Sequence, residues 1–251
     1  MKTAHHLLGE DETLDSFYHG RILIIQKKRG YRFSVDAPLL ADFIQTKETD
    51  VLLEIGAGSG VISLLLSLKP FRRIVCLEVQ KGLAGLARRN IRLNGLEDKI
   101  KVVERDVRKY RPRIKFDVIF SNPPYIKKKT GVTSASAEKA IAKHEIKGDI
   151  FDIMHFTGKS LKRDGLAYFI YPARRKEDFD RALETNGLRI KALRWVHTRS
   201  GSDAHWFLAE CDFSSLSAET RPPLFLYDGK GKYTGEMKKI FAGESRGEIF
   251  S

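Results

Sequence analysis

The sequence predicts an α/β fold with a doubly wound, mostly parallel sheet, and three observations support this prediction. From residue 51 onward, short apolar runs typical of buried strands alternate with amphipathic segments typical of helices. The first apolar run, Val51–Ile55, ends in a glycine-rich loop of the kind found at the carboxyl edge of parallel sheets. Near the end of the chain, two strand-like segments flank Ser200-Gly201-Ser202. We therefore expect seven strands, one of them antiparallel to the others.

The elements follow in order. Arg21–Gln26 is expected to be a short strand that turns at Lys28-Arg29-Gly30 into Tyr31–Ser34. Further strands are predicted at Val51–Ile55, Arg73–Val79, Ile100–Glu104, Phe116–Phe120, Gly165–Tyr171, Arg189–His197 and Ala204–Cys211, and helices at Val61–Leu68, Lys81–Asn94, Ile150–Leu161 and Lys176–Thr185. The pattern predicts a strand, hairpin and helix extension in residues 1–45, a core in 46–215, and a tail with a short strand and helix in 216–251.

Composition narrows the class of protein. The chain has 251 residues and a formal net charge of +13, with 42% hydrophobic residues. These values exclude collagen, a disulfide scaffold and wholesale disorder. The charge predicts a polyanionic partner, and residues 101–130 hold ten lysines and arginines against three acidic residues.

Several signals of location and metal binding do not occur in the sequence. Cys76 and Cys211 each lie in an apolar run, which indicates buried thiols in a reducing compartment. The acidic N-terminal segment has no signal-peptide pattern, and no run is apolar enough to span a membrane. We therefore expect a cytoplasmic protein without a membrane anchor. No metal-ligand spacing is present, so no metal site is expected, and a monomer is assumed.

A glycine loop and two acidic residues follow three successive strands. Gly56-Ala57-Gly58-Ser59-Gly60 comes after the first strand of the core, Glu78 ends the second, and Asp106 follows the third. A glycine loop lets the backbone approach a ligand closely, while the two carboxylates can accept hydrogen bonds from ribose hydroxyls and an adenine amine. The set predicts a site for an adenosine-containing ligand. The GxGxG spacing disfavours a dinucleotide.

The fourth strand runs into Asn122-Pro123-Pro124-Tyr125. Two prolines stiffen the turn and remove two N–H donors, which leaves the Asn122 side-chain oxygen and the Pro123 carbonyl as acceptors. Such acceptors beside an aromatic ring suit a flat amine. The alternative interpretation is a rigid turn with a surface tyrosine.

These motifs together resemble the class I S-adenosylmethionine-dependent amino-methyltransferases, which have a Rossmann-like sheet. The segments Gly30–Leu40 and Pro222–Thr234 are similar to those of bacterial tRNA (adenine-N6) methyltransferases that act on adenosine 37 of valine tRNA. The resemblance spans roughly residues 14–240. It implies S-adenosylmethionine as cofactor and tRNA as partner.

The resemblance also implies roles for individual residues. Asn122, Pro123 and Tyr125 would hold and stack the target base, and the cofactor would contact Glu54, Gly56, Gly58, Glu78, Asp106, Val107, Tyr31, Phe33 and Asp36. The RNA backbone would contact Lys127, Lys128, Lys129, Arg194 and Arg199. Alternatives with the same turn are an rRNA guanine-N2 methyltransferase and a protein glutamine-N5 methyltransferase. An RNA-binding protein with a degenerate site and a NAD-dependent oxidoreductase are alternatives from other classes.

Overall fold

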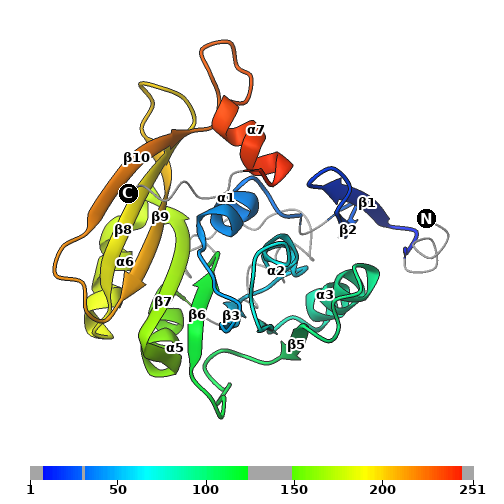
Figure 1. Cartoon of the computed structure of the whole chain (residues 1–251), viewed down its shortest axis with the longest axis horizontal. Helices are drawn as coiled ribbons and strands as arrows, with labels where there is room; N and C mark the ends of the chain where they lie inside the picture. The colour runs from blue at the N-terminus through cyan, green and yellow to red at the C-terminus, as the bar shows by residue number, and fades with distance from the viewer. Residues whose placement is uncertain (1–7, 30–31, 124–148, 245–251) are drawn as a thin grey trace, which may run out of the picture.

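A computed structural model describes residues 8–29, 32–123 and 149–244. Its main sheet has eight strands in the order β10-β8-β9-β7-β6-β3-β4-β5, and β1 pairs with β2 in a separate hairpin (Figure 1). The bounds are β1 Glu12–Phe17, β2 Ile22–Lys27, β3 Val51–Ile55, β4 Arg73–Glu78, β5 Ile100–Glu104, β6 Phe116–Ser121, β7 Leu161–Pro172, β8 Arg189–His197, β9 Ala204–Asp212 and β10 Glu219–Phe225. The helices are α1 Asp36–Phe43, α2 Val61–Leu66, α3 Lys81–Leu93, α5 Ile150–Ser160, η2 Ala173–Arg175, α6 Lys176–Thr185 and α7 Gly235–Ala242.

The doubly wound, mostly parallel sheet is confirmed, with one more strand than expected. β9 runs antiparallel to β7 and β8, whereas the other neighbouring strands of the main sheet are parallel. The additional strand is β10, which pairs in parallel with β8 at the edge of the sheet. Its register shifts between Arg221 and Leu224, where Pro222 and Pro223 lie. Proline is tolerated there because an edge strand has no second partner to bond.

Each face of the sheet carries its own hydrophobic core. Alternate residues of β3 divide between the two cores: Leu52 packs toward α1, α2 and α3, whereas Leu53 packs toward α5 and α6. This division follows from the period-two alternation of side chains along a strand. A strand buried on both faces must be apolar throughout, which explains why Val51–Ile55 reads as a continuous hydrophobic run.

The N-terminal hairpin differs from the prediction. β2 pairs with the preceding strand β1, and Arg32, Phe33 and Ser34 are not in a strand. The turn lies at Tyr18–Arg21, where Tyr18, His19 and Gly20 all have positive φ. Two of these residues are not glycine, so the sequence carries a weak signal for a turn that needs left-handed backbone.

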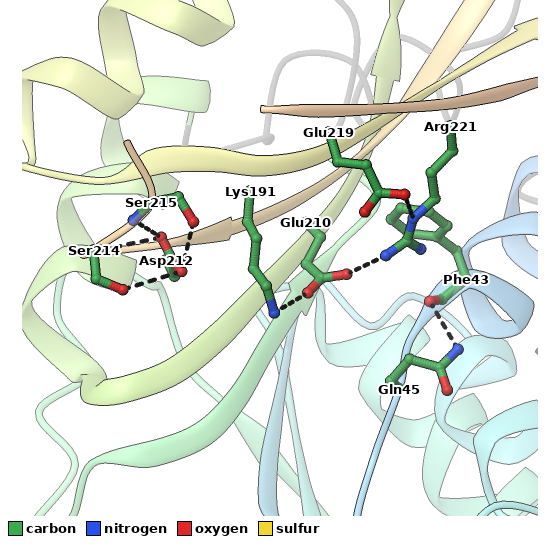
Figure 2. Close-up of polar contacts among 9 residues, drawn as sticks. All are labelled: Phe43, Gln45, Lys191, Glu210, Asp212, Ser214, Ser215, Glu219 and Arg221. Atoms are coloured by element: carbon green, nitrogen blue, oxygen red, sulfur yellow. Dashed lines mark hydrogen bonds and ion pairs between the residues drawn. The ribbon is translucent and has the colours of Figure 1, made fainter. Parts of the chain in front are cut away.

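The C-terminal residues extend the sheet and then cross to α1. After β10, the chain enters α7, which begins at Thr234 with a side-chain cap to the Met237 N–H and lies near α1 (Figure 1). Figure 2 shows the contacts that attach β10: Glu210 on β9 accepts from Lys191 at 2.8 Å and from Arg221 at 3.0 Å. The Arg221 guanidinium also lies 5.0 Å from the ring centroid of Phe43 in α1.

Both cysteines are buried thiols without a disulfide, as expected. Within the described ranges, no helix is long and apolar enough to cross a membrane.

Candidate functional site

The site lies where the winding direction of the sheet reverses. The chain passes from β3 outward to β4 and β5 and then returns to β6 on the other side of β3. Ile55 and Ser121 are paired at the ends of β3 and β6, so Gly56 and Asn122 emerge side by side. In open α/β sheets such a switch point is where ligands bind.

The glycine loop after β3 has a backbone that other residues adopt poorly. Gly56, Gly58 and Gly60 have φ of 72°, 57° and 80°. Gly60 also packs closely on α3, since a Cβ there would lie 3.3 Å from the Cβ of Ala87. A Cβ on Gly56, in contrast, would meet nothing within 4 Å among the described residues. The loop therefore has its close packing on the α3 side and open space at Gly56.

Glu78 at the end of β4 holds the loop in place. Its Oε2 accepts from Gly58 N–H at 2.8 Å, and its Oε1 accepts from Gln80 N–H at 2.8 Å. Burial raises the pKa of Glu78 above its ordinary value, against the effect of these backbone bonds. Each carboxylate oxygen can accept two hydrogen bonds, so each retains an acceptor position for a ligand hydroxyl.

Asp106, after β5, is buried and paired with Arg108. Its Oδ1 accepts from the Arg108 backbone N–H and Nε, both at 3.0 Å, and its Oδ2 accepts from Nη2 at 2.6 Å. These bonds hold the pKa of Asp106 below its ordinary value, so the group stays ionised. The remaining acceptor position on Oδ2 is suited to one amine hydrogen. The next residue, Val107, is also buried and packs under β3 and β4.

Glu54 lies beneath the loop and not on its outer surface. The side chain is fully buried in β3, and its Oε2 accepts from the Ser63 hydroxyl at 2.5 Å and from the Cys76 thiol at 3.8 Å. Burial raises the pKa of Glu54 to about 8, so the carboxyl group is mostly protonated at neutral pH. The structure therefore shows Glu54 bracing the start of α2 from below.

The predicted acceptor turn follows β6. Ser121 is buried and donates from Oγ to the Ile55 carbonyl at 2.7 Å, which fixes the end of β6 against β3. Asn122 is half-buried and Pro123 is buried. Tyr125, Lys127, Lys128, Lys129 and Tyr31 lie outside the described residues.

The segment before α1 is tied to the hairpin. The Phe33 N–H donates to Gln26 Oε1 at 3.3 Å, and the Phe33 ring lies 5.1 Å from that of Phe17. Asp36 is buried at the start of α1, where its Oδ1 accepts from the Ser34 hydroxyl at 2.6 Å and from Ala37 N–H at 3.0 Å. A carboxylate in the first turn of a helix is electrostatically favourable.

Two asparagines, Asn90 on α3 and Asn94 at its C-cap, bind the N-terminal hairpin, and Asn90 also binds the glycine loop; no sequence motif indicated a role for either. Asn90 bonds to the backbone of Ile25 through both its amide groups, and its Nδ2 also donates to the Ser59 carbonyl at 3.0 Å. Asn94 bonds in the same way to Leu23. The available signal was two asparagines four residues apart on the buried face of an amphipathic helix, where polar side chains need partners.

The residues around the loop fit an adenosyl cofactor. The open space beside Gly56 would admit a ligand, and Glu78 and Asp106 retain acceptor positions. On the same loop, the buried hydroxyl of Ser59 has no hydrogen-bond partner among the described residues. A buried polar atom without a partner is costly, and a polar ligand group would relieve that cost.

The two predicted RNA contacts on β8 and its turn differ from each other. Arg199 is exposed in the β8–β9 turn. Arg194 is 16% exposed, pairs with Glu236 of α7 at 2.6 Å and donates to the Pro222 carbonyl at 2.9 Å. The structure thus uses Arg194 to attach the C-terminal tail. In the part of the chain that the structure describes, no cluster of three or more histidine, cysteine or acidic residues could hold a metal ion.

Comparison with known proteins agrees with this geometry. Residues 32–151 match the family model of the methyltransferase small domain. A tRNA1(Val) (adenine(37)-N6)-methyltransferase from Phocaeicola vulgatus is 28% identical over 183 residues, covering 73% of this chain and 77% of that protein. A protein of the same name from Pedobacter heparinus is 26% identical over 210 residues, covering 83% of this chain and 88% of that protein.

A solved structure shows the same fold. A predicted O-methyltransferase from Agrobacterium tumefaciens superposes with a TM-score of 0.66 and 21% identity, covering 83% of this chain and 96% of that one. The predicted fold class and enzyme class are thereby confirmed. The chain is a methyltransferase with the class I fold, and its residues 32–151 match the family model of the methyltransferase small domain.

Proposed function

We propose that this methyltransferase transfers a methyl group from S-adenosylmethionine to the exocyclic N6 amine of an adenine in tRNA. The observation that carries the proposal is the alignment of the glycine loop, Glu78, Asp106 and Asn122-Pro123 at the ends of four neighbouring parallel strands. The names of the relatives favour adenosine 37 of a valine tRNA as the target. Because its proposed substrate is tRNA, we propose that the enzyme acts in the cytoplasm. We further propose that it acts as a monomer.

The cofactor would lie across the loop. Gly56 and Gly58 would line its methionine portion, with Phe33 and Asp36 closing that end. Glu78 would accept from the ribose hydroxyls. Asp106 and the Val107 backbone would bind the adenine, for which Asp106 is already ionised and has one acceptor position left.

S-adenosylmethionine supplies a methyl group already activated by its sulfonium, so the protein has to position the amine and exclude water. The Asn122 side-chain oxygen and the Pro123 carbonyl would accept the two hydrogens of the target amine, which directs the nitrogen lone pair toward the methyl group. The base must leave its stack to reach them. Tyr125 would stack on it, an interaction worth about 1–3 kcal/mol.

A basic groove beside the adenine end of the site offers a path for the RNA backbone. The groove, of about 580 Å³, lies between residues 107–115 and α5, and we name it the β5–β6 groove. It starts at Val107 and is lined by five cationic side chains and one carboxylate: Arg108, Arg111, Arg113, Lys115, Lys159 and Asp152. Lys127, Lys128, Lys129 and Arg199 are the further backbone contacts that we propose.

Replacing Arg113, Lys115 and Lys159 together by glutamine tests the groove. Removing one cation that neutralises a phosphate lowers the salt dependence of RNA affinity by about 0.7–0.9, so we expect a slope smaller by about 2. The matched control replaces three exposed lysines of the tail, Lys230, Lys232 and Lys239. If RNA affinity had the same salt dependence in both variants, the β5–β6 groove would not be part of the RNA-binding surface.

The reaction is tested by incubating total tRNA with labelled S-adenosylmethionine and analysing the nucleosides. N6-methyladenosine at position 37 of one valine tRNA is the expected product. N2-methylguanosine, or methylated protein only, would contradict the proposal and favour one of the alternative amines.

Asn122→Ala tests the mechanism. We expect a rate at least about a hundredfold lower, because the variant has only the Pro123 carbonyl left as a preorganised acceptor for the target amine. Binding of S-adenosylmethionine, measured by calorimetry, should be unchanged. Wild-type turnover in Asn122→Ala would contradict the mechanism.

A further inference from the structure

The free edge of β2 is completed by side chains and not by another strand. β2 pairs with β1 on one side, and on the other side the backbone groups of Leu23 and Ile25 face α3. Asn94 Oδ1 accepts from Leu23 N–H at 2.9 Å, and its Nδ2 donates to the Leu23 carbonyl at 2.7 Å. Asn90 does the same at Ile25, at 2.7 and 3.1 Å.

The spacing of the two asparagines explains why the match is good. Four helical residues rise about 6 Å, and two strand residues rise about 6.6 Å. Side chains at i and i+4 of α3 therefore meet every second residue of β2. Each amide offers one acceptor and one donor group, as a neighbouring strand would. The exposed edge of the hairpin is closed in this way.

Asn90 makes one bond that Asn94 does not. Its Nδ2 donates its second hydrogen to the Ser59 carbonyl, at 3.0 Å, in the middle of the glycine loop. Asn90 is fully buried, so these bonds have no competition from water. One amide thus joins the N-terminal hairpin to the loop.

The connection continues to the segment before α1. Gln26 follows Ile25 on β2, is buried, and accepts from Phe33 N–H. The hairpin therefore contacts two walls of the cofactor site: the glycine loop through Asn90 and the Phe33–Asp36 segment through Gln26.

We propose that Asn90 is a positioning residue for cofactor binding, which fixes the Ser59–Gly60 peptide and couples it to the hairpin. The inference rests on the proposed use of S-adenosylmethionine by the loop. Asn90 touches no cofactor atom and acts through the loop backbone.

Asn90→Asp and Asn94→Asp form a matched pair. Each replaces an amide donor by oxygen at one rung of the ladder and removes one further bond. That bond leads to the Ser59 carbonyl of the loop in Asn90→Asp, and to the Asn90 backbone carbonyl within the helix in Asn94→Asp. We expect the affinity for S-adenosylmethionine to fall about tenfold in Asn90→Asp and to stay at the wild-type value in Asn94→Asp. Both variants should lose thermal stability. Equal affinities in two folded variants would overturn the proposal.

Hydrogen exchange of the wild-type protein covers the case in which Asn90→Asp does not fold. S-adenosylmethionine should slow exchange in β2, because the loop and β2 share one amide, and should leave β10 unchanged. Cofactor binding without added protection in β2 would contradict the role of Asn90. No binding to the wild type would instead contradict the proposed cofactor.

Discussion

Two extensions flank the methyltransferase core, and each is anchored by a buried glutamate between two cations. In the N-terminal hairpin, Glu12 receives two bonds from Arg89 of α3, at 2.7 and 2.6 Å, and lies 3.3 Å from Lys27. The C-terminal tail is attached through Arg221 of β10, which pairs with Glu210 on β9 of the core, and Glu210 also pairs with Lys191 of β8 (Figure 2). The two anchors have the same chemistry. If breaking them changes cofactor affinity to different extents, the difference must come from what each extension contacts.

The contacts of the two extensions lead to different places. From the hairpin, hydrogen bonds continue through Asn90 to the glycine loop and through Gln26 to Phe33. From the tail, hydrogen bonds lead to β8 and β9, and a cation–π contact of Arg221 with Phe43 leads to the end of α1. The hairpin thus supports the proposed cofactor site, whereas the tail extends the sheet and packs against α1.

The extensions also meet each other. At the end of α7, a Cβ on Gly243 would lie 2.7 Å from the Tyr18 ring, and Arg21 donates to the Ala242 carbonyl at 3.2 Å. Variants must therefore separate an effect on the whole fold from an effect on the site, which requires stability and cofactor affinity to be measured on the same samples.

Glu12→Gln should have the largest effect. It removes the charge of a buried carboxylate and one of its two bonds to Arg89, so we expect a loss of about 3 kcal/mol in the free energy of unfolding, about 2 from the charge and about 1 from the hydrogen bond. Urea denaturation measures this loss. Glu10→Gln, an exposed position in the same hairpin, is the control and should change little. A Glu12→Gln protein as stable as Glu10→Gln would show that the anchor is not needed.

Glu210→Gln should lower the free energy of unfolding by less, about 2 kcal/mol. Glu210 receives a single contact from each of two cations and no bidentate pair. Glu219→Gln, whose side chain is 59% exposed, is the control in the same cluster. A loss larger than that of Glu12→Gln would reverse the ranking of the two anchors.

The pH dependence of stability sharpens the comparison further. Hydrogen bonds from Arg89 lower the pKa of Glu12 to about 2, below its ordinary value. The folded state therefore gains stability from the carboxylate above about pH 4.5, and loses that gain as the pH falls toward 2. Lys27 and Arg89 are partly exposed, so solvent screening limits the gain to about 2 kcal/mol. Denaturation at several pH values should show the difference between wild type and Glu12→Gln shrinking over this interval. A constant difference would contradict the assigned pKa.

Arg194→Ala should have the smallest effect, lowering the free energy of unfolding by about 1 kcal/mol, since its partner Glu236 is 43% exposed. Hydrogen exchange should be faster in α7, and RNA affinity should fall no more than in other single-cation variants. Arg199→Ala, in the exposed turn, is the comparison. If Arg194→Ala lowered RNA affinity much more than Arg199→Ala, Arg194 would have to be assigned to the substrate site.

The sequence predicted the parts of the site that depend on local order along the chain. The glycine loop follows β3, Glu78 ends β4 and Asp106 follows β5, so the parallel sheet brings all three to one edge. The hairpin partner was wrong because the turn at Tyr18 and His19 lacks the residues that usually indicate positive φ. β10 was left in the tail and not counted as a sheet strand, since Pro222 and Pro223 argue against a central strand. The ladder of Asn90 and Asn94 depends on how α3 lies against β2, which no local pattern specifies.

The central claim is that the hairpin, and not the tail, supports the proposed cofactor site. Calorimetry of S-adenosylmethionine binding to Glu12→Gln and Glu210→Gln, at a temperature where both are folded, tests this claim most directly. We expect weaker binding in Glu12→Gln, by about threefold to tenfold, and wild-type affinity in Glu210→Gln. Equal affinities, or weaker binding only in Glu210→Gln, would contradict it.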